Sequence, residues 1–153
     1  MKLDNLDLDI LKHMQDNSRI SLRQLGQKLE TPHTTVFTRV KRLEKNGFIK
    51  KFSAILHPQD LGLKIGVLFI DAPASQSKQI AEEISQLEEV NNVYRTFDGK
   101  IIAHAMVPDL DGQRGLEEFL AKLDNYDIQV YPVDDIVKHS HCVSNNALER
   151  LKK

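Results

Sequence analysis

Apolar residues in the first third of the chain recur at spacings of three and four, as they do along one face of a helix. Three such groups are separated by short polar stretches, and they consist of Leu3, Leu6, Ile10, Leu11 and Met14, then Leu22, Leu25 and Leu29, then Val36, Val40 and Leu43. The pattern predicts three helices, the last two joined by about three residues. So short a connection is typical of a helix-turn-helix, which lays its second helix in the major groove of DNA.

Residue types that start and stop helices bracket the third group. The Thr31 hydroxyl can accept a hydrogen bond from a free backbone N–H, and Pro32 suits the first position of a helix. Asn46-Gly47 is typical of a left-handed cap at the helix C-terminus. Next we expect a strand that acts as a wing or as an arm for dimer pairing, with strand-forming residues at Phe48, Ile49, Phe52, Ala54 and Ile55.

The rest of the chain alternates apolar runs with helical patterns. Strands are predicted at residues 65–72, 93–97, 101–107 and about 128–137, and helices around Ile80 and Ile84 and around Leu116 to Leu123. Asp98-Gly99 between two of these strands is a hairpin signal. The order βαββαβ is the ferredoxin-like arrangement, an open sheet with helices on one face only. The other face must be buried against something else, and dimerisation is the simplest answer.

The predicted fold class is therefore α+β, with a winged helix-turn-helix domain followed by a ferredoxin-like βαββαβ domain. We expect the DNA-binding domain at residues 1–50 and a linker strand and hinge at 51–62, because residues 57–62 (HPQDLG) are rich in turn formers. An oligomerisation and effector-binding domain is then expected at 63–153.

The predicted exposed face of the third helix carries side chains suited to DNA. Thr35, Thr38, Arg39 and Arg42 recur at i, i+3, i+4 and i+7. Arginine can bind guanine through two hydrogen bonds, threonine offers a hydroxyl to a base or phosphate, and the neighbouring lysines suit phosphates. A solvated basic helix with no such role is the alternative. The candidate DNA-binding residues are Arg23, His33, Thr34, Thr35, Thr38, Arg39, Arg42, Lys50 and Lys51.

Charge favours the DNA-binding interpretation. Residues 1–57 hold 11 lysines and arginines against 6 acidic residues, about +5, whereas residues 58–153 hold 10 against 16, about −6. We therefore expect DNA contact to be confined to the first part. The sequence has no apolar run long enough to span a bilayer and no signal-peptide core, and its single cysteine, Cys142, fits a reducing compartment. A cytoplasmic location is expected.

The chain resembles the AsnC/Lrp family of transcriptional regulators, through LDNLDLDIL at its start and RVKRLEKNGFIKKFSAIL at the predicted domain junction. The resemblance covers nearly the whole chain. It implies DNA binding by the N-terminal domain, homodimers formed through the strands and the C-terminal sheet, and assembly into tetramers or octamers. It also implies a small-molecule effector, commonly an amino acid, bound between dimers.

One loop departs from the family pattern. The effector loop of the family is similar to Thr-Gly-Asp-Tyr-Asp, whereas this chain has Thr96-Phe97-Asp98-Gly99-Lys100. A glycine permits close approach of a ligand and a carboxylate pairs with an ammonium group, so Phe97 and Lys100 favour a different ligand, such as an anion, or a plain hairpin. The candidate effector-binding residues are Thr96, Asp98, Gly99 and Lys100.

Two other classes of function stay open. Decarboxylases of modified tetrapyrroles have a similar architecture and would hold substrate carboxylates with histidine or arginine; the acidic second part of the chain argues against this enzyme. The other class is an amino-acid sensor whose helix-turn-helix no longer binds DNA. The sequence contains no catalytic or phosphate-binding motif, and His139, His141 and Cys142 do not complete a four-ligand set. We expect neither enzymatic activity nor a cofactor or metal.

Overall fold

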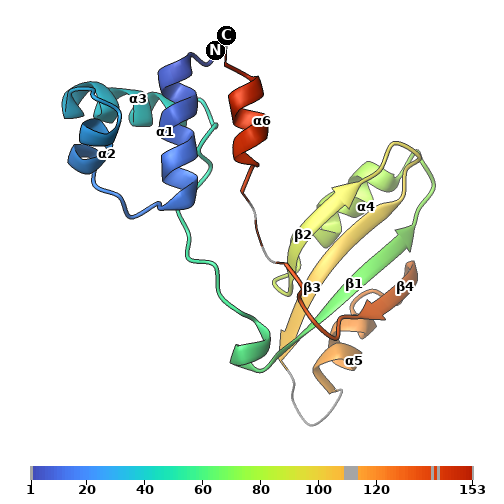
Figure 1. Cartoon of the computed structure of the whole chain (residues 1–153). Coiled ribbons are helices and arrows are strands. Elements are labelled where there is room, and N and C mark those ends of the chain that lie inside the picture. Colours follow the sequence, from blue (N-terminus) through green and yellow to red (C-terminus); the bar gives the residue numbers. More distant parts are fainter. Residues whose placement is uncertain (1, 109–113, 139, 141, 153) are drawn as a thin grey trace. The chain divides into compact units, whose positions relative to one another are not determined.

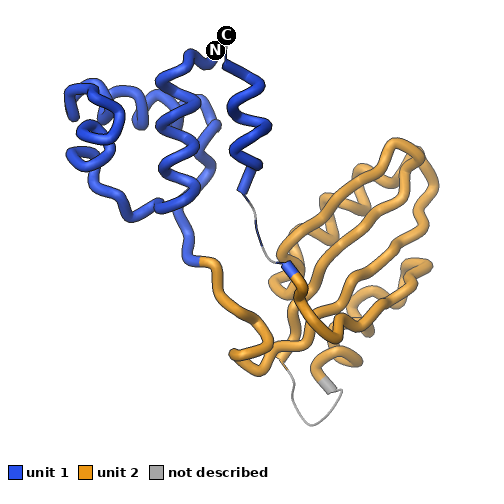
Figure 2. Tube along the Cα trace, in the orientation of Figure 1, with its two compact units in different colours: residues 1–54, 138–153 blue, residues 55–137 orange. Residues whose placement is uncertain are grey.

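The chain folds into two compact units (Figure 2). The computed structural model describes residues 2–108, 114–138, 140 and 142–152, and His139 and His141 lie outside them. Unit 1 comprises Met1–Ala54 and Lys138–Lys153, and unit 2 comprises Ile55–Val137. Each unit has its own hydrophobic core. Among the described residues, a helix of the length and apolarity needed to cross a membrane is not found.

Unit 1 contains the three helices predicted from the apolar spacing: α1 (Asn5–Asp16), α2 (Leu22–Lys28) and α3 (His33–Lys45) (Figure 1). Each begins where the sequence offers a start signal. The Asp4 carboxylate accepts from the Asp7 N–H at 2.9 Å, and the Ser21 hydroxyl oxygen accepts from the Gln24 N–H at 3.2 Å. The apolar faces meet in a core made of Ile10, Met14, Leu25, Val36, Val40 and Leu43.

The start of α3 differs from the prediction, whereas its end agrees with it. At its start, Pro32 is the capping residue, and the Thr31 hydroxyl donates to the Leu29 carbonyl at 2.8 Å instead of accepting from the helix. At its end, Gly47 has φ +73°, and the Phe48 N–H donates to the Leu43 carbonyl at 3.0 Å. This second pattern is a Schellman motif, as the Asn46-Gly47 pair predicted.

The strand predicted after α3 does not form. Residues 50–57 have no regular secondary structure, although Ile49 packs against the core of unit 1. A strand requires a neighbouring strand to satisfy its backbone groups, and none is available to this segment within the described chain. The expectation of a strand is therefore wrong for the single chain, and pairing with a second copy remains a proposal.

Unit 2 has the predicted βαββαβ order. Its elements are β1 (Leu63–Asp71), α4 (Ser77–Ile84), β2 (Val90–Arg95), β3 (Ile101–Pro108), α5 (Arg114–Ala121) and β4 (Asp127–Pro132), with a 3₁₀ turn at Gln59–Leu61 before them. The antiparallel sheet has the order β2-β3-β1-β4. Helices α4 and α5 cover one face (Figure 1), where Ile80, Ile84 and Phe119 pack on β1 and β3. Strand β4 ends at Pro132, before the predicted limit at 137, although the Val133 N–H still donates to the Ile65 carbonyl at 2.9 Å.

A further helix, α6 (Asn145–Arg150), was not predicted and lies beside α1 in unit 1 (Figure 1). Lys12 Nζ lies 2.8 Å from Glu149 Oε1, and Lys152 Nζ lies 2.6 Å from Asp9 Oδ1. Residues 138–153 therefore belong to unit 1, whereas the sequence interpretation placed them in a domain spanning 63–153. Because α6 buries a single large apolar residue, Leu148, its sequence carries no apolar periodicity to reveal it.

Candidate nucleic-acid interface

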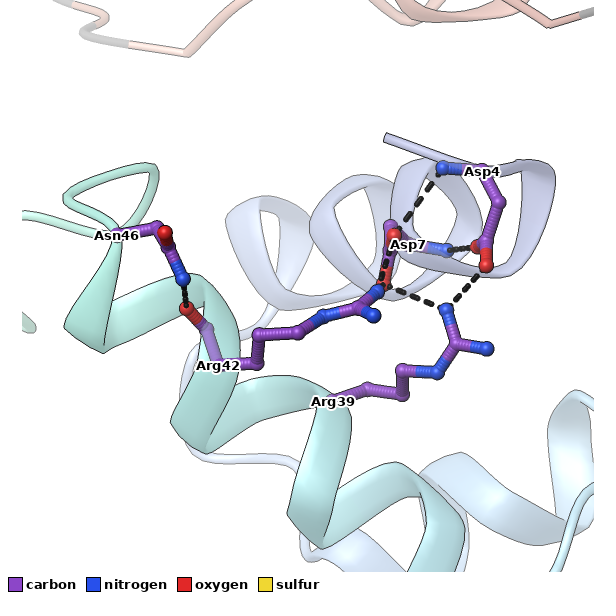
Figure 3. Close-up of polar contacts among 5 residues, drawn as sticks. All are labelled: Asp4, Asp7, Arg39, Arg42 and Asn46. Atoms are coloured by element: carbon purple, nitrogen blue, oxygen red, sulfur yellow. Dashed lines mark hydrogen bonds and ion pairs between the residues drawn. The ribbon is translucent and has the colours of Figure 1, made fainter. Parts of the chain in front are cut away.

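The start of α1 and the middle of α3 are joined by a cluster of ion pairs (Figure 3). Asp7 is fully buried, and Arg42 Nη2 lies 2.7 Å from each of its carboxylate oxygens. Arg39 Nη1 lies 3.2 Å from Asp7 Oδ1 and also donates to the Asp4 carboxylate. The backbone N–H of Asp4 adds a hydrogen bond of 3.1 Å to Asp7. The buried carboxylate is thus paired with cations and hydrogen-bonded, as a buried charge must be.

Because of these contacts, two candidate DNA-binding residues are less exposed than the sequence predicted. The side chains of Arg39 and Arg42 retain 25% and 39% of their exposure. Hydrogen bonding from Arg39 lowers the pKa of Asp4, and the same contact raises the pKa of Arg39. The sequence analysis predicted both arginines on the exposed face of α3, with no partner within the protein. The structure instead pairs them with Asp4 and Asp7, so both guanidinium groups are engaged within the protein.

The side of α3 away from the core exposes a different row of residues. Thr34, Thr38, Lys41 and Lys45 follow one another at spacings of three and four. Phe37 lies three residues after Thr34 and four before Lys41, and all five are exposed. The Thr38 hydroxyl donates to the Thr34 carbonyl at 3.0 Å, which leaves its oxygen free to accept. We call these five residues the α3 outer face. Thr34 and Thr38 were predicted, Phe37 was missed, and the predicted Thr35 is half-buried.

The turn between α2 and α3 depends on a glycine. A Cβ at Gly26 would lie 2.6 Å from the Thr31 carbonyl oxygen, closer than side chains come to backbone. Glu30 adopts φ +48°, the left-handed region, to make the same turn. Two candidate residues, Arg23 and His33, line a surface pocket beside it. Lys50 and Lys51, also candidates, are exposed after the end of α3.

The structural division sharpens the charge asymmetry. Because residues 138–153 join unit 1, that unit holds 15 lysines and arginines against 7 acidic residues, a formal charge of +8. Unit 2 holds 6 against 15, a formal charge of −9. The positive potential of unit 1 favours a polyanionic partner, and unit 2 would repel one.

Comparison with known proteins identifies the family. Residues 3–50 match the family model for winged helix-turn-helix DNA-binding domains. An uncharacterised HTH-type transcriptional regulator of Pyrococcus horikoshii is 33% identical over 127 residues, which cover 81% of this chain and 80% of that protein. An HTH-type transcriptional regulator of Methanocaldococcus jannaschii is 30% identical over 138 residues, covering 88% and 86% respectively.

Solved structures agree over nearly the whole chain. A crystal structure of a second P. horikoshii HTH-type regulator superposes with a TM-score of 0.83 at 27% identity, covering 93% of this chain and 99% of that one. The AsnC protein of E. coli shares the fold with a TM-score of 0.75 at 21% identity, covering 93% and 99%. This chain belongs to the HTH-type transcriptional regulators, and it has the fold of AsnC/Lrp regulators. It is therefore a DNA-binding transcriptional regulator, and the comparisons lend no support to the tetrapyrrole decarboxylase alternative.

In this regulator the loop between β2 and β3 is a tight hairpin. The Thr96 N–H donates to the Lys100 carbonyl at 2.9 Å, and Gly99 makes the turn with φ +91°. The Thr96 hydroxyl donates to Asp98, which lowers the pKa of that carboxyl. Lys100 Nζ lies 3.8 Å from the Asp71 carboxylate, so its charge is partly neutralised. The four candidate effector residues are thus brought together at one end of the sheet, where β2 joins β3.

The sheet of this regulator leaves one face without helices. Along it, Phe69 and Tyr131 meet edge to face with ring centroids 5.4 Å apart, and Tyr94 and His104 meet in the same way at 5.9 Å. Phe69, Tyr94 and Tyr131 are 39%, 52% and 53% exposed. So many aromatic groups on one open face are typical of an interaction surface.

Proposed function

We propose that this HTH-type regulator binds inverted DNA half-sites as a dimer or higher oligomer, with α3 of each copy in a major groove. The observation that carries the proposal is the α3 outer face, which presents hydroxyl and ammonium groups from a unit of formal charge +8. Thr34 and Thr38 are suited to bases or phosphates. Arg23, His33, Lys50 and Lys51 flank α3 and are suited to phosphates.

Arg39 and Arg42 receive a different role in this proposal. Their ion pairs with Asp4 and Asp7 orient α3 against α1, and the orientation of α3 sets how its outer face meets the groove. Substituting either arginine would then weaken specific binding through a displaced helix, with no relaxation at one defined base pair.

Selection of bound sequences from a pool of random duplexes, with the full chain at near-physiological salt, tests the proposal. We expect an inverted repeat whose half-sites lie roughly 34 Å apart or a multiple of that. Lys41→Ala should weaken binding to all sequences, whereas Lys78→Ala, on α4 of the acidic unit, should have no effect. Enrichment of no sequence, or equal effects of the two variants, would contradict the proposed interface.

The open face of the sheet is the proposed dimer surface, because aromatic and aliphatic side chains from all four strands lie on it. Tyr131→Glu would place a charge on this face, on the strand β4, and should shift the chain to a monomer in sedimentation velocity. Lys78→Glu, on a helix that covers the other face, is the control. A variant that sediments like the wild type would disprove this surface.

We further propose that the hairpin from Thr96 to Lys100 takes part in binding a small effector. Support comes from the Neisseria meningitidis regulator whose structure is a complex with L-Met; it shares this fold with a TM-score of 0.77 at 20% identity, covering 96% of this chain and 99% of that one. Isothermal titration of the full chain with each of the amino acids tests this proposal, with Asp98→Ala as the variant. Absence of binding by every amino acid would leave the loop as a hairpin only.

A further inference from the structure

The α3 outer face contains one large apolar side chain among polar ones. Phe37 is 49% exposed, and Thr34 and Lys41 lie three residues before it and four residues after it. The adjacent Val36 is fully buried in the core of unit 1, so Phe37 is not a surplus core residue that could turn inward. Its ring faces away from the core, on the element that the proposed function places in the major groove.

The chemistry of phenylalanine limits what it can recognise there. The ring has neither a hydrogen-bond donor for the N7 and O6 atoms of guanine nor an acceptor for an exocyclic amine. The apolar group that a base pair presents in the major groove is the C5-methyl of thymine. We propose that Phe37 packs against this methyl group and makes the regulator select thymine at one position of each half-site.

The surroundings of Phe37 favour DNA over a protein partner. Thr34, Thr38, Lys41 and Lys45 share its face, in a unit of formal charge +8. Against an apolar protein surface, the ammonium groups beside the ring would lose their water, which costs free energy. Against DNA, the ammonium groups reach phosphates while the ring reaches the base pairs in the groove. The inference rests on the proposed function, since it needs α3 in the groove.

Replacement of single thymines by deoxyuridine tests this inference, because uracil lacks only the methyl group. The selected duplex is synthesised with deoxyuridine at each thymine position in turn, and its Kd for the full chain is measured. At one position per half-site the wild type should lose about fourfold in affinity, the worth of one buried methyl group. Phe37→Ala should bind the thymine and uracil duplexes equally, and Phe37→Leu should keep part of the difference.

Two controls separate the possible explanations. Val137→Ala shortens an exposed apolar side chain of unit 2 and should leave the uracil effect unchanged. A cytosine and a 5-methylcytosine at the same position should differ for the wild type and not for Phe37→Ala, which shows that the methyl group itself is recognised. A uracil effect of the same size in wild type and Phe37→Ala would overturn the inference. Failure to enrich any sequence would instead overturn the proposed function.

Discussion

At the scale of single residues, a cluster of ion pairs among Asp4, Asp7, Arg39 and Arg42 joins α1 to α3. Asp7 has no exposed surface, and its negative charge is compensated by the two guanidinium groups that contact it. Removing one member of such a pair is costly because the remaining charge keeps its desolvation penalty without its partner. The cluster therefore stabilises the orientation of α3, and both arginines are engaged in ion pairs within unit 1.

Asp7→Ala should destabilise the chain by about 2–3 kcal/mol, somewhat less than a fully buried pair, because Arg42 can still reach water. Urea denaturation followed by circular dichroism measures the change. Asp16→Asn, at the exposed far end of α1, should stay within about 0.5 kcal/mol of the wild type. Equal effects of the two substitutions would show that the ion pairs do not stabilise unit 1.

Asp4 gives the same cluster a dependence on pH. Its folded-state pKa lies below the usual 3.8 because Arg39 donates a hydrogen bond to it. The resulting stability is therefore present above about pH 4, the unfolded value, and is lost as the pH falls through the folded value. Asp4→Asn keeps a capping side chain without the charge. The difference in melting temperature between the wild type and this variant should shrink between pH 5 and pH 3. A constant difference would show that the Asp4 charge does not stabilise the fold.

At the scale of elements, the helix-turn-helix depends on how closely α2 and α3 approach. The turn has room for a hydrogen atom, but not a methyl group, at Gly26, and the left-handed conformation at Glu30 completes it. Both features follow from joining two packed helices with few residues. The angle between these helices decides which residues of α3 are exposed.

Gly26→Ala should destabilise the chain by about 1–3 kcal/mol, because the new methyl group would press against the Thr31 backbone. It should also weaken specific DNA binding by moving α3. Gly66→Ala is the matched control, since its Cβ would meet only the Val130 side chain, at 3.7 Å. Thermal unfolding measures both, and a Gly26→Ala protein as stable as the control would show that the turn adjusts without strain.

At the scale of the whole molecule, charge is divided between the two units. Unit 1 carries +8 and unit 2 carries −9, so the near-neutral total conceals a protein with one surface for DNA and one that avoids it. Helix α6 adds to this division, because its segment brings four lysines and arginines to unit 1.

Binding to duplex DNA should weaken steeply with salt. Because each lost phosphate contact lowers the slope of log K against log salt by about 0.9, Lys41→Ala and Lys45→Ala should each reduce it by about 1. Fluorescence anisotropy between 50 and 200 mM salt provides the measurement. A slope that Lys78→Ala reduces as much as Lys41→Ala does would place the phosphate contacts outside the α3 outer face.

The sequence by itself determined the two-part organisation and most elements, because apolar residues at helical or alternating spacing have few ways to be buried. It also determined the hairpin at Asp98-Gly99 and the cap at Gly47, where local backbone conformation is sufficient. Only the tertiary structure decided which basic residues of α3 are engaged within the protein. Asp4 with Arg39, and Asp7 with Arg42, are 35 positions apart in the chain and had to meet before these ion pairs could form. The tertiary structure likewise decided that α6 lies beside α1, through ion pairs, and that Phe37 is exposed. Long-range contacts of this kind leave no periodic pattern in the sequence.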